Sequence, residues 1–324
     1  MSTLVVTQTE LRSCLPLDMR SLEAVEEAFS WIAQGRVSMP PVMHIDVDPD
    51  SAVDIKGAYV EGIDQIAVKI ATGFVRNPDA GLPSSSSAIA LINAANGFFD
   101  AMFLDNGYLM DLRTGLAGGV AAKHLAPVDV DTVGVVGTGA QARYQIESLA
   151  LVRPFRRLLA FGRNRERVAR YCSDMTATLG VPVTPADSLE DLTRASQVIV
   201  TTTHATSPLI RAEWVQPGTH ITAMGSDLPG KQELDPALLQ SADQVVCDSI
   251  PQCRIGGELQ HADETKMKQP AVHLGAYTSG RSEFARAPEA ITVCDLTGTG
   301  AQDTAIGVAA FKRIKAAGLG RMIG

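Results

Sequence analysis

The chain has 324 residues, of which 45% are hydrophobic and 20% are charged, so it is long enough for two domains with an ordinary globular core. Its formal net charge of −8, with no dominant Lys/Arg cluster, excludes a typical nucleic-acid-binding surface. No apolar run approaches the roughly 18 residues of a membrane span, and no signal-peptide pattern opens the chain, so we expect a cytoplasmic protein that acts on a small molecule.

The cysteines are few and scattered. They are Cys14, Cys172, Cys247, Cys253 and Cys294. Without paired spacing they predict reduced thiols, and they favour neither a disulfide framework nor a metal site.

The N-terminal segment is predicted to form a strand, a helix and a series of further strands. Residues 4–6 form a short apolar strand, and apolar residues repeat at helical spacing between Leu22 and Ile32. Apolar alternation predicts strands at residues 39–46, 54–60, 65–71, 88–92 and 101–107. In the strand at 65–71, Ile66, Val68 and Ile70 are expected to face the core, which sends Lys69 to the opposite side.

Residues 108–125 are predicted to form a helix rich in Gly and Ala. Gly115, Gly118 and Gly119 allow such a helix to approach a neighbour closely, as at a domain junction. We therefore expect a domain boundary within this helix or just after it.

A glycine motif organises the next segment. Val133 to Val136 form a near-continuous apolar strand, and Gly137-x-Gly139-x-x-Ala142 then opens a run with helical periodicity. A strand, a glycine turn and a helix in this order are typical of a dinucleotide site, because the helix N-terminus faces the phosphates. The alternative for such a short motif is an ordinary glycine turn.

The segment after the motif alternates strands and helices. Strands are predicted at residues 157–161, 197–202, 220–224, 244–248 and 290–294, with a helix at 165–179. This alternation predicts an α/β domain with a parallel, doubly wound sheet. A final helix at 304–317 is expected to pack on the N-terminal sheet, and Gly298 and Gly300 before it are expected to form a loop. The predicted domains are therefore a discontinuous α+β domain, 1–125 plus 304–324, and an inserted dinucleotide-binding domain, 126–303.

The end of the second strand indicates which dinucleotide binds. A chain that binds NAD usually has a carboxylate there for the ribose 2′-OH, whereas this chain has Arg163, Asn164 and Arg165, with no carboxylate before Glu166. Two guanidinium groups suit a 2′-phosphate, so we predict NADP as the cofactor and leave NAD open. In the alternative reading, both arginines only solvate the start of a helix.

Five ordered motifs resemble the ornithine cyclodeaminase/μ-crystallin family over nearly the whole chain. They lie at residues 68–70, 112–114, 136–141, 223–234 and 295–299. Within the family the chain is most similar to the ectoine-utilisation branch, through motifs at residues 39–41, 56–59, 81–83 and 104–109. The resemblance implies a Rossmann domain inserted in a substrate-binding and dimerisation domain, and a homodimer.

The same resemblance implies site residues. Lys69 and Arg113 match the cations that bind the substrate carboxylate, and Asp227 matches the catalytic aspartate, with Lys69 also able to exchange protons. The alternatives are two surface cations and a turn Asp before Pro-Gly. The cofactor-binding residues implied are Gly137, Thr138, Gly139, Ala140, Gln141, Arg163, Asn164, Arg165, Thr114, Thr202, Met224 and Gly225.

Two substrate-binding positions depart from the cyclodeaminase pattern. His44 stands where a further Arg is usual, and Lys56 stands where ornithine cyclodeaminase has a carboxylate for the distal amine. Lys56 would repel an ornithine-like substrate and suit a second carboxylate, unless it points to solvent. His204 either lines the nicotinamide region or is a structural histidine.

The sequence thus predicts an NAD(P)H-dependent reductase of a small α-imino acid, of ketimine or iminosuccinate type, reversible as an amino-acid dehydrogenase. One alternative is a cyclodeaminase of a diamino acid. The other, a different class of protein, is a non-catalytic carrier of NADP or another small ligand. Keeping Lys69, Arg113 and Asp227 together favours catalysis, since a carrier needs no proton donor.

Overall fold

The computed structural model describes residues 2–324, apart from the side chain of Pro78, and the chain forms two compact units. The first unit comprises Met1–Arg113 and Thr299–Gly324, and the second comprises Thr114–Gly298. The sequence placed the boundaries later, after residues 125 and 303. One observed boundary lies within α3 (Tyr108–Leu125), and the other lies just before α10 (Gly300–Ala317). No helix in the described part of the chain is long and apolar enough to cross a membrane.

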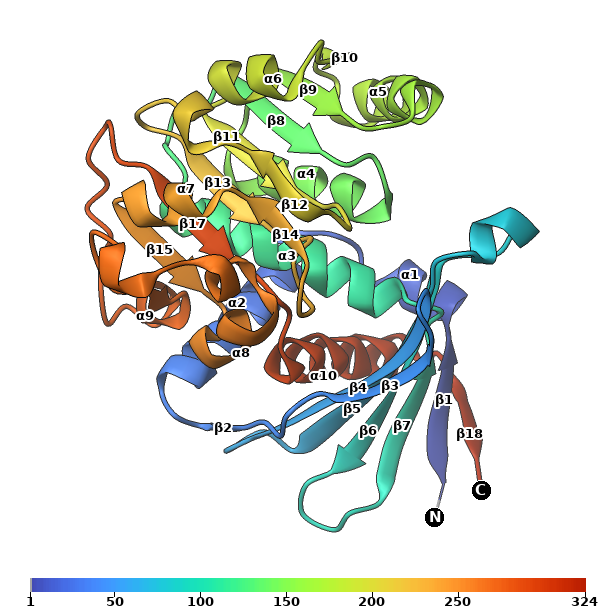
Figure 1. Ribbon diagram of the computed structural model, residues 1–324. Coiled ribbons are helices and arrows are strands. Elements are labelled where there is room, and N and C mark those ends of the chain that lie inside the picture. The colour runs from blue at the N-terminus through green and yellow to red at the C-terminus, as the bar shows by residue number, and fades with distance from the viewer. Residues whose placement is uncertain (1) are drawn as a thin grey trace. The chain divides into compact units, whose positions relative to one another are not determined.

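The first unit is an eight-stranded sheet covered on one face by helices (Figure 1). Its path runs β18-β1-β7-β6-β5-β4-β2, and β3 pairs with β4. The strands are β1 (Thr3–Thr7), β2 (Val37–Ser38), β3 (Met43–Asp48), β4 (Ser51–Val60), β5 (Gln65–Phe74), β6 (Ser85–Asn93), β7 (Phe99–Leu104) and β18 (Arg321–Ile323). The helices, besides α10 and the start of α3, are α1 (Gln8–Cys14), α2 (Met19–Ala33) and the short 3-10 turn η1 (Asn77–Ala80).

Helix α10 lies directly on this sheet, where it contacts β4, β5 and α2 (Figure 1). A Cβ on Gly300 would lie 2.5 Å from the carbonyl oxygen of Gly57, so only glycine allows the first turn to sit this close to β4. The Thr304 hydroxyl donates to the carbonyl oxygen of Ala58 at 2.9 Å. The expected packing of the last helix on the N-terminal sheet is confirmed, but the expected loop at Gly300 is wrong because the helix begins there.

The second unit contains an all-parallel sheet of eight strands in the order β10-β9-β8-β11-β13-β17-β15-β16. These strands are β8 (Thr132–Val136), β9 (Arg157–Phe161), β10 (Val183–Pro185), β11 (Val198–Thr201), β13 (His220–Ala223), β15 (Gln244–Cys247), β16 (Val272–His273) and β17 (Thr292–Asp295), and a separate parallel pair joins β12 (Thr206–Ile210) to β14 (Gln232–Leu234). The order reverses between β8 and β11, which is where doubly wound sheets bind ligands. The predicted α/β fold with an inserted dinucleotide-binding domain is confirmed.

Helices of the second unit connect these strands. They are α4 (Ala140–Val152), α5 (Arg165–Leu179), α6 (Leu189–Ala195), α7 (Pro236–Ser241), α8 (Ile250–Gly256) and α9 (Gly275–Thr278), with 3-10 turns η2 (Ala212–Trp214), η3 (Glu258–His261) and η4 (Glu264–Lys266). The predicted close approach of the Gly-rich helix α3 is confirmed within this unit. A Cβ on Gly115 would lie 2.5 Å from Cβ of Tyr144, a residue of α4.

Candidate active site

The glycine turn after β8 is built as the motif predicts. Gly137 has φ +106°, a conformation that favours glycine, and its missing Cβ would lie 2.5 Å from Oγ1 of Thr202. Its N–H donates to the carbonyl oxygen of Phe161 at 2.9 Å. The turn therefore holds the carboxyl ends of β8, β9 and β11 together.

The N-terminus of α4 is open to a ligand. Gly139 is the N-cap residue and provides no side-chain cap, and no atom lies within 4 Å of the place its Cβ would occupy. Ala140 and Gln141 begin the helix, so their N–H groups lie in the turn that binds phosphate in dinucleotide sites. Thr138 lies beside Gly162 at the end of β9. The arrangement fits a pyrophosphate.

The predicted 2′-phosphate site lies after β9. The Asn164 side chain accepts a hydrogen bond from the N–H of Arg167 at 2.9 Å, so it caps α5. Arg163 and Arg165 are exposed on either side of it. Both guanidinium groups are therefore accessible at the end of β9.

Asp227 lies in the loop that follows β13, at the carboxyl edge of the parallel sheet. Its side chain is 44% exposed and its Oδ1 lies 2.5 Å from Nζ of Lys231. The loop continues through Pro229 and Gly230, which are also exposed. The sequence analysis did not name Lys231, because i, i+4 spacing brings side chains together on a helix and this segment is a loop.

His204 follows β11 at the same edge of the sheet. Burial lowers its pKa, the charge of Lys231 lowers it further, and the charge of Asp227 opposes both. The histidine is therefore neutral at pH 7 and lies within electrostatic range of the Asp227 loop.

Three other predicted cofactor residues lie in the second unit. Met224 is buried and its N–H donates to the carbonyl oxygen of Thr201. Thr114, in α3, accepts a hydrogen bond at its carbonyl oxygen from the Gln145 side chain at 2.8 Å. Gly225 directly follows Met224, so it belongs to the same loop as Asp227.

The first unit contains a buried ion cluster. Nζ of Lys69 lies 2.9 Å from Oδ2 of Asp303, and Nε of Arg113 lies 3.0 Å from Oδ1 of the same carboxylate. These side chains are at most 6% exposed. Arg113 also donates from Nη1 to the Gln302 side chain at 3.2 Å. Two buried cations therefore share one buried carboxylate.

Charge and burial act in opposite directions within this cluster. Burial lowers the pKa of Lys69 to about 7, and the charge of Arg113 lowers it as well, against the attraction of Asp303. Burial by itself raises the pKa of Asp303, but Lys69 and Arg113 together hold it below its usual value. When Lys69 is protonated, the three side chains carry one net positive charge. The cluster is thus suited to one more anion.

Two errors of the sequence analysis concern this cluster. Lys69 and its strand neighbour Ala67 face the helix-covered side of the sheet and are buried, whereas Ile70 is 48% exposed on the other side. Asp303 was not recognised, because its partners are distant in sequence. The structure shows it inside a stretch in which every residue from 300 to 308 is buried.

Lys56 and His44 extend from the same face of the sheet. Lys56 lies directly opposite Lys69 in the β4–β5 pair, and His44 lies opposite Asp54 in the β3–β4 pair. Opposed residues share a face. Lys56 is half-buried and its charge lowers the pKa of Lys69, whereas Nδ1 of His44 is engaged by Asp54 at 2.6 Å. Lys56 therefore belongs to the electrostatic surroundings of the cluster.

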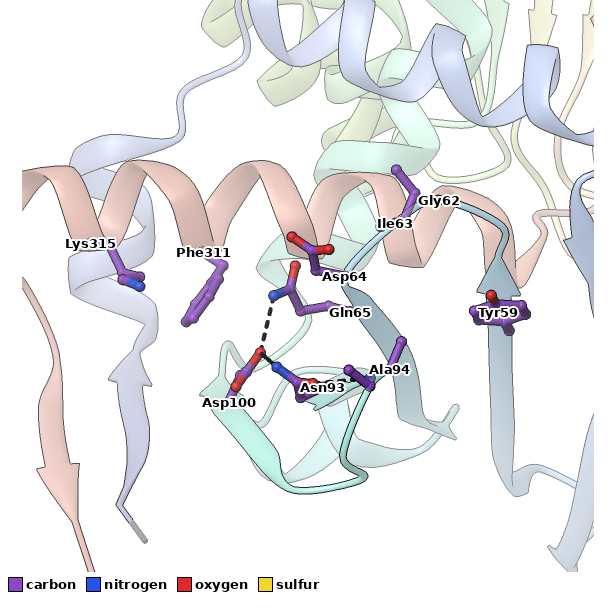
Figure 2. Close-up of a pocket in the computed structure, with 11 residues that line it drawn as sticks. Tyr59, Gly62, Ile63, Asp64, Gln65, Asn93, Ala94, Asp100, Phe311 and Lys315 are labelled. Atoms are coloured by element: carbon purple, nitrogen blue, oxygen red, sulfur yellow. Dashed lines mark hydrogen bonds between the residues drawn. The ribbon is translucent and has the colours of Figure 1, made fainter.

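Two other features are a hollow in the first unit and a group of buried side chains in the second. A hollow of about 520 Å³ in the first unit is lined by residues such as Asp64, Asp100 and Phe311 (Figure 2), and Gln65 there donates to Asp100 at 3.0 Å. Cys247, Cys253 and Asp295 form a buried group of potential metal ligands, which the sequence did not predict. Three ligands are fewer than a structural zinc site uses, and burial raises the pKa of Cys253 well above its usual value.

Comparison with known proteins identifies the family. The model of the ornithine cyclodeaminase/mu-crystallin family matches residues 1–317. The chain belongs to this family. It is 40% identical to a putative dehydrogenase of Rhizobium meliloti over 98% of this chain and 97% of that protein.

Two solved structures share the fold over the whole chain. An archaeal alanine dehydrogenase dimer with bound NAD is 31% identical, with a TM-score of 0.91 and coverage of 100% of this chain and 99% of that one. The iminosuccinate reductase of Paracoccus denitrificans with NAD⁺ is 29% identical, with a TM-score of 0.91 and full coverage of both chains. Structural relatives of this family member thus include dehydrogenases and reductases with a bound nicotinamide dinucleotide.

The buried cluster generates a stability prediction. Asp303→Asn leaves Lys69 and Arg113 buried without a carboxylate, so we expect a loss of about 3 kcal/mol or more in the free energy of unfolding, measured with urea. The control is Glu190→Gln, which breaks an ion pair to Arg194 whose side chains are both 47% exposed. That change should cost less than about 0.5 kcal/mol. Equal effects of the two substitutions would contradict the account.

Proposed function

We propose that this protein is a nicotinamide-dinucleotide-dependent reductase of a small α-imino acid, reversible as an amino-acid dehydrogenase. The observation that carries the proposal is the pair of buried cations, Lys69 and Arg113, which share the single carboxylate of Asp303. Their remaining positive charge matches the carboxylate of an α-imino acid. The open N-terminus of α4 and the NAD-bound structural relatives support the dinucleotide.

The residues of the chain take defined parts in this reaction. When bound, the reduced dinucleotide supplies a hydride to the imine carbon. Lys69 and Arg113 bind the substrate carboxylate and thereby orient the C=N bond. Asp227 stabilises the charge at the imine nitrogen and exchanges its proton, while Lys231 fixes the carboxylate in place. Lys69, with a pKa of about 7, is a second group able to exchange a proton near neutral pH.

The proton role is tested by Asp227→Asn, which keeps the size of the side chain and removes its charge. We expect a rate loss of at least about 100-fold in the reduction of imines formed from keto acids and ammonia, with dinucleotide affinity little changed. Asp263→Asn is the matched control, since Asp263 is 41% exposed and pairs with Lys266 at 2.9 Å. Near-normal turnover by Asp227→Asn would return that residue to a turn role.

We also propose NADP as the preferred cofactor. The support is the exposed pair of Arg163 and Arg165 at the end of β9, with the intervening Asn164 used as a helix cap. We expect Arg163→Asp to weaken NADPH binding at least about tenfold with little effect on NADH, because hydrogen bonds to charged groups are worth about 1.5–3 kcal/mol. Arg170→Asp, at an exposed arginine of α5 beyond the first turn of that helix, is the control. Equal affinities of the unmodified protein for NADPH and NADH would defeat this proposal.

The substrate side chain is proposed to carry a second carboxylate, as in iminosuccinate. Lys56 shares the face of Lys69 and lies directly opposite it, so a cation stands near the α-carboxylate site. The same cation disfavours a cyclodeaminase reaction on ornithine, whose distal ammonium it would repel.

This preference is measured as kcat/KM for oxaloacetate with ammonia against pyruvate with ammonia and a cyclic imine. We expect the dicarboxylate to be preferred, and Lys56→Glu to reverse the order, because the substitution replaces attraction by repulsion. Lys312→Glu, an exposed position of α10, should leave the order unchanged. A preference of the unmodified enzyme for the cyclic imine would sink the proposal.

Finally, we propose that the chain forms a homodimer through the uncovered face of the first unit's sheet. That face presents Met43, Ile45, Ile70 and Leu104, each between 47% and 58% exposed, which is unusual for a monomer surface. An archaeal relative is described as a dimer. The mass in solution, measured by light scattering, should be that of two chains.

Ile70→Lys should convert this dimer to a monomer without unfolding it, because the side chain is already exposed. Val128→Lys, at a 79% exposed apolar position of the second unit, should leave the dimer intact. A monomeric unmodified protein at micromolar concentration would contradict the proposal.

A further inference from the structure

We infer that Glu233 is a positioning residue, whose buried carboxylate fixes the Asp227 loop after β13 against the loop after β11. The inference rests on the proposed function for its catalytic consequence. Glu233 lies in β14, is fully buried, and does not belong to the catalytic or binding residues named above.

Three hydrogen bonds converge on this carboxylate. Oε1 accepts from the N–H of Thr203 at 2.6 Å, and Oε2 accepts from the N–H of Gly225 at 2.8 Å and from the hydroxyl of Thr201 at 2.6 Å. Thr203 immediately precedes His204, and Gly225 lies two residues before Asp227. One side chain therefore ties together the two loops that carry His204 and Asp227.

The loop after β11 and the Asp227 loop approach each other so closely at Gly225 that only a glycine fits there. A Cβ there would overlap the carbonyl oxygen of Thr203 and would lie 2.5 Å from the Glu233 carboxylate. Glu233 is itself fixed from behind, because its N–H donates to Oε1 of Glu258 at 2.8 Å and the next N–H donates to Oε2. Glu233 is therefore fixed to η3 and does not move freely with the Asp227 loop.

The rest of the Asp227 loop is braced in the same way. The Ser226 hydroxyl donates to the carbonyl oxygens of Lys231 and Gly256, and the N–H of Gly230 donates to the Gln260 side chain. Backbone bonds from Met224 to Thr201 and from Gln232 to Ala205 join the two ends of this loop to β11 and to the loop after it, and the Gly225 N–H adds the side-chain contact nearest to Asp227. Loss of that single acceptor should displace Asp227 relative to His204 without unfolding the loop.

Glu233→Gln tests this assignment. An amide has one oxygen, so its NH₂ group must face the N–H of either Thr203 or Gly225, and one of the two loop contacts is lost. We expect kcat for imine reduction to fall about 100-fold, as for a misplacement of about 1 Å, with KM and dinucleotide affinity within about threefold. Retention of kcat within about threefold would overturn the inference.

The matched control is His220→Gln. The buried His220 ring contacts the hydroxyls of Thr292 and Thr222 at 2.8 and 3.1 Å, at the start of β13 and thus at the opposite edge of the same sheet. His220→Gln should lower thermal stability about as much as Glu233→Gln does, and it should leave kcat unchanged. An equal loss of kcat in both variants would show a merely structural role for Glu233.

Two further measurements separate this inference from the proposed function. When Asp227→Asn is already present, adding Glu233→Gln should lower kcat by less than a further factor of about three, because the effect of Glu233 acts through Asp227. Amide hydrogen exchange of residues 201–205 and 224–231 should become faster in Glu233→Gln, whether or not the unmodified protein reduces an imine. Absence of imine reduction by the unmodified protein would remove only the proposed function. Unchanged exchange in both segments would overturn the positioning role itself.

Discussion

The first unit depends on one buried interaction, the carboxylate of Asp303 between Lys69 and Arg113. None of the three charges would be tolerated alone at positions this buried, because removing an ion from water costs several kcal/mol. The contact joins β5, α3 and α10, and α10 reaches it only because Gly300 lets its first turn rest on β4 at Gly57. A replacement of these three residues by apolar ones could keep the fold. The cluster nevertheless contains two cations and one anion, and this excess positive charge is the basis of the proposed binding of a substrate carboxylate.

In the second unit, the main structural constraint is the placement of the loops at the carboxyl edge of a parallel sheet. Gly137 fits against Thr202, and Gly225 fits against Thr203, so two glycines set the spacing of neighbouring loops. The buried carboxylate of Glu233 then accepts the N–H groups of Gly225 and Thr203. Glu258 in turn accepts the N–H of Glu233 itself. The exposed Asp227 thus stands on a rigid base, which suits a group that must meet a substrate in one geometry.

Much of the second unit could be predicted from the sequence, because its signals are local. The strand at 157–161 and the helix at 165–179 match β9 and α5 to the residue, since an apolar run, an Asn cap and a Gly stop define them. The side of the sheet on which Lys69 lies could not be predicted. Alternation shows which residues share a face, but both faces of this sheet carry apolar residues, and Ile70 lies on the uncovered one. Asp303 was equally out of reach, because its contact to Lys69 spans 234 residues.

The central claim is that Lys69 and Arg113 hold the substrate carboxylate. It is tested most directly by a crystal structure of the protein with oxidised dinucleotide and the amino-acid product of whichever imine it reduces. The account predicts the product's α-carboxylate within hydrogen-bonding distance of Nζ of Lys69 and of the Arg113 guanidinium, with Asp303 still in contact with both. A product carboxylate bound elsewhere, with the three-residue cluster unchanged and closed to it, would contradict the account.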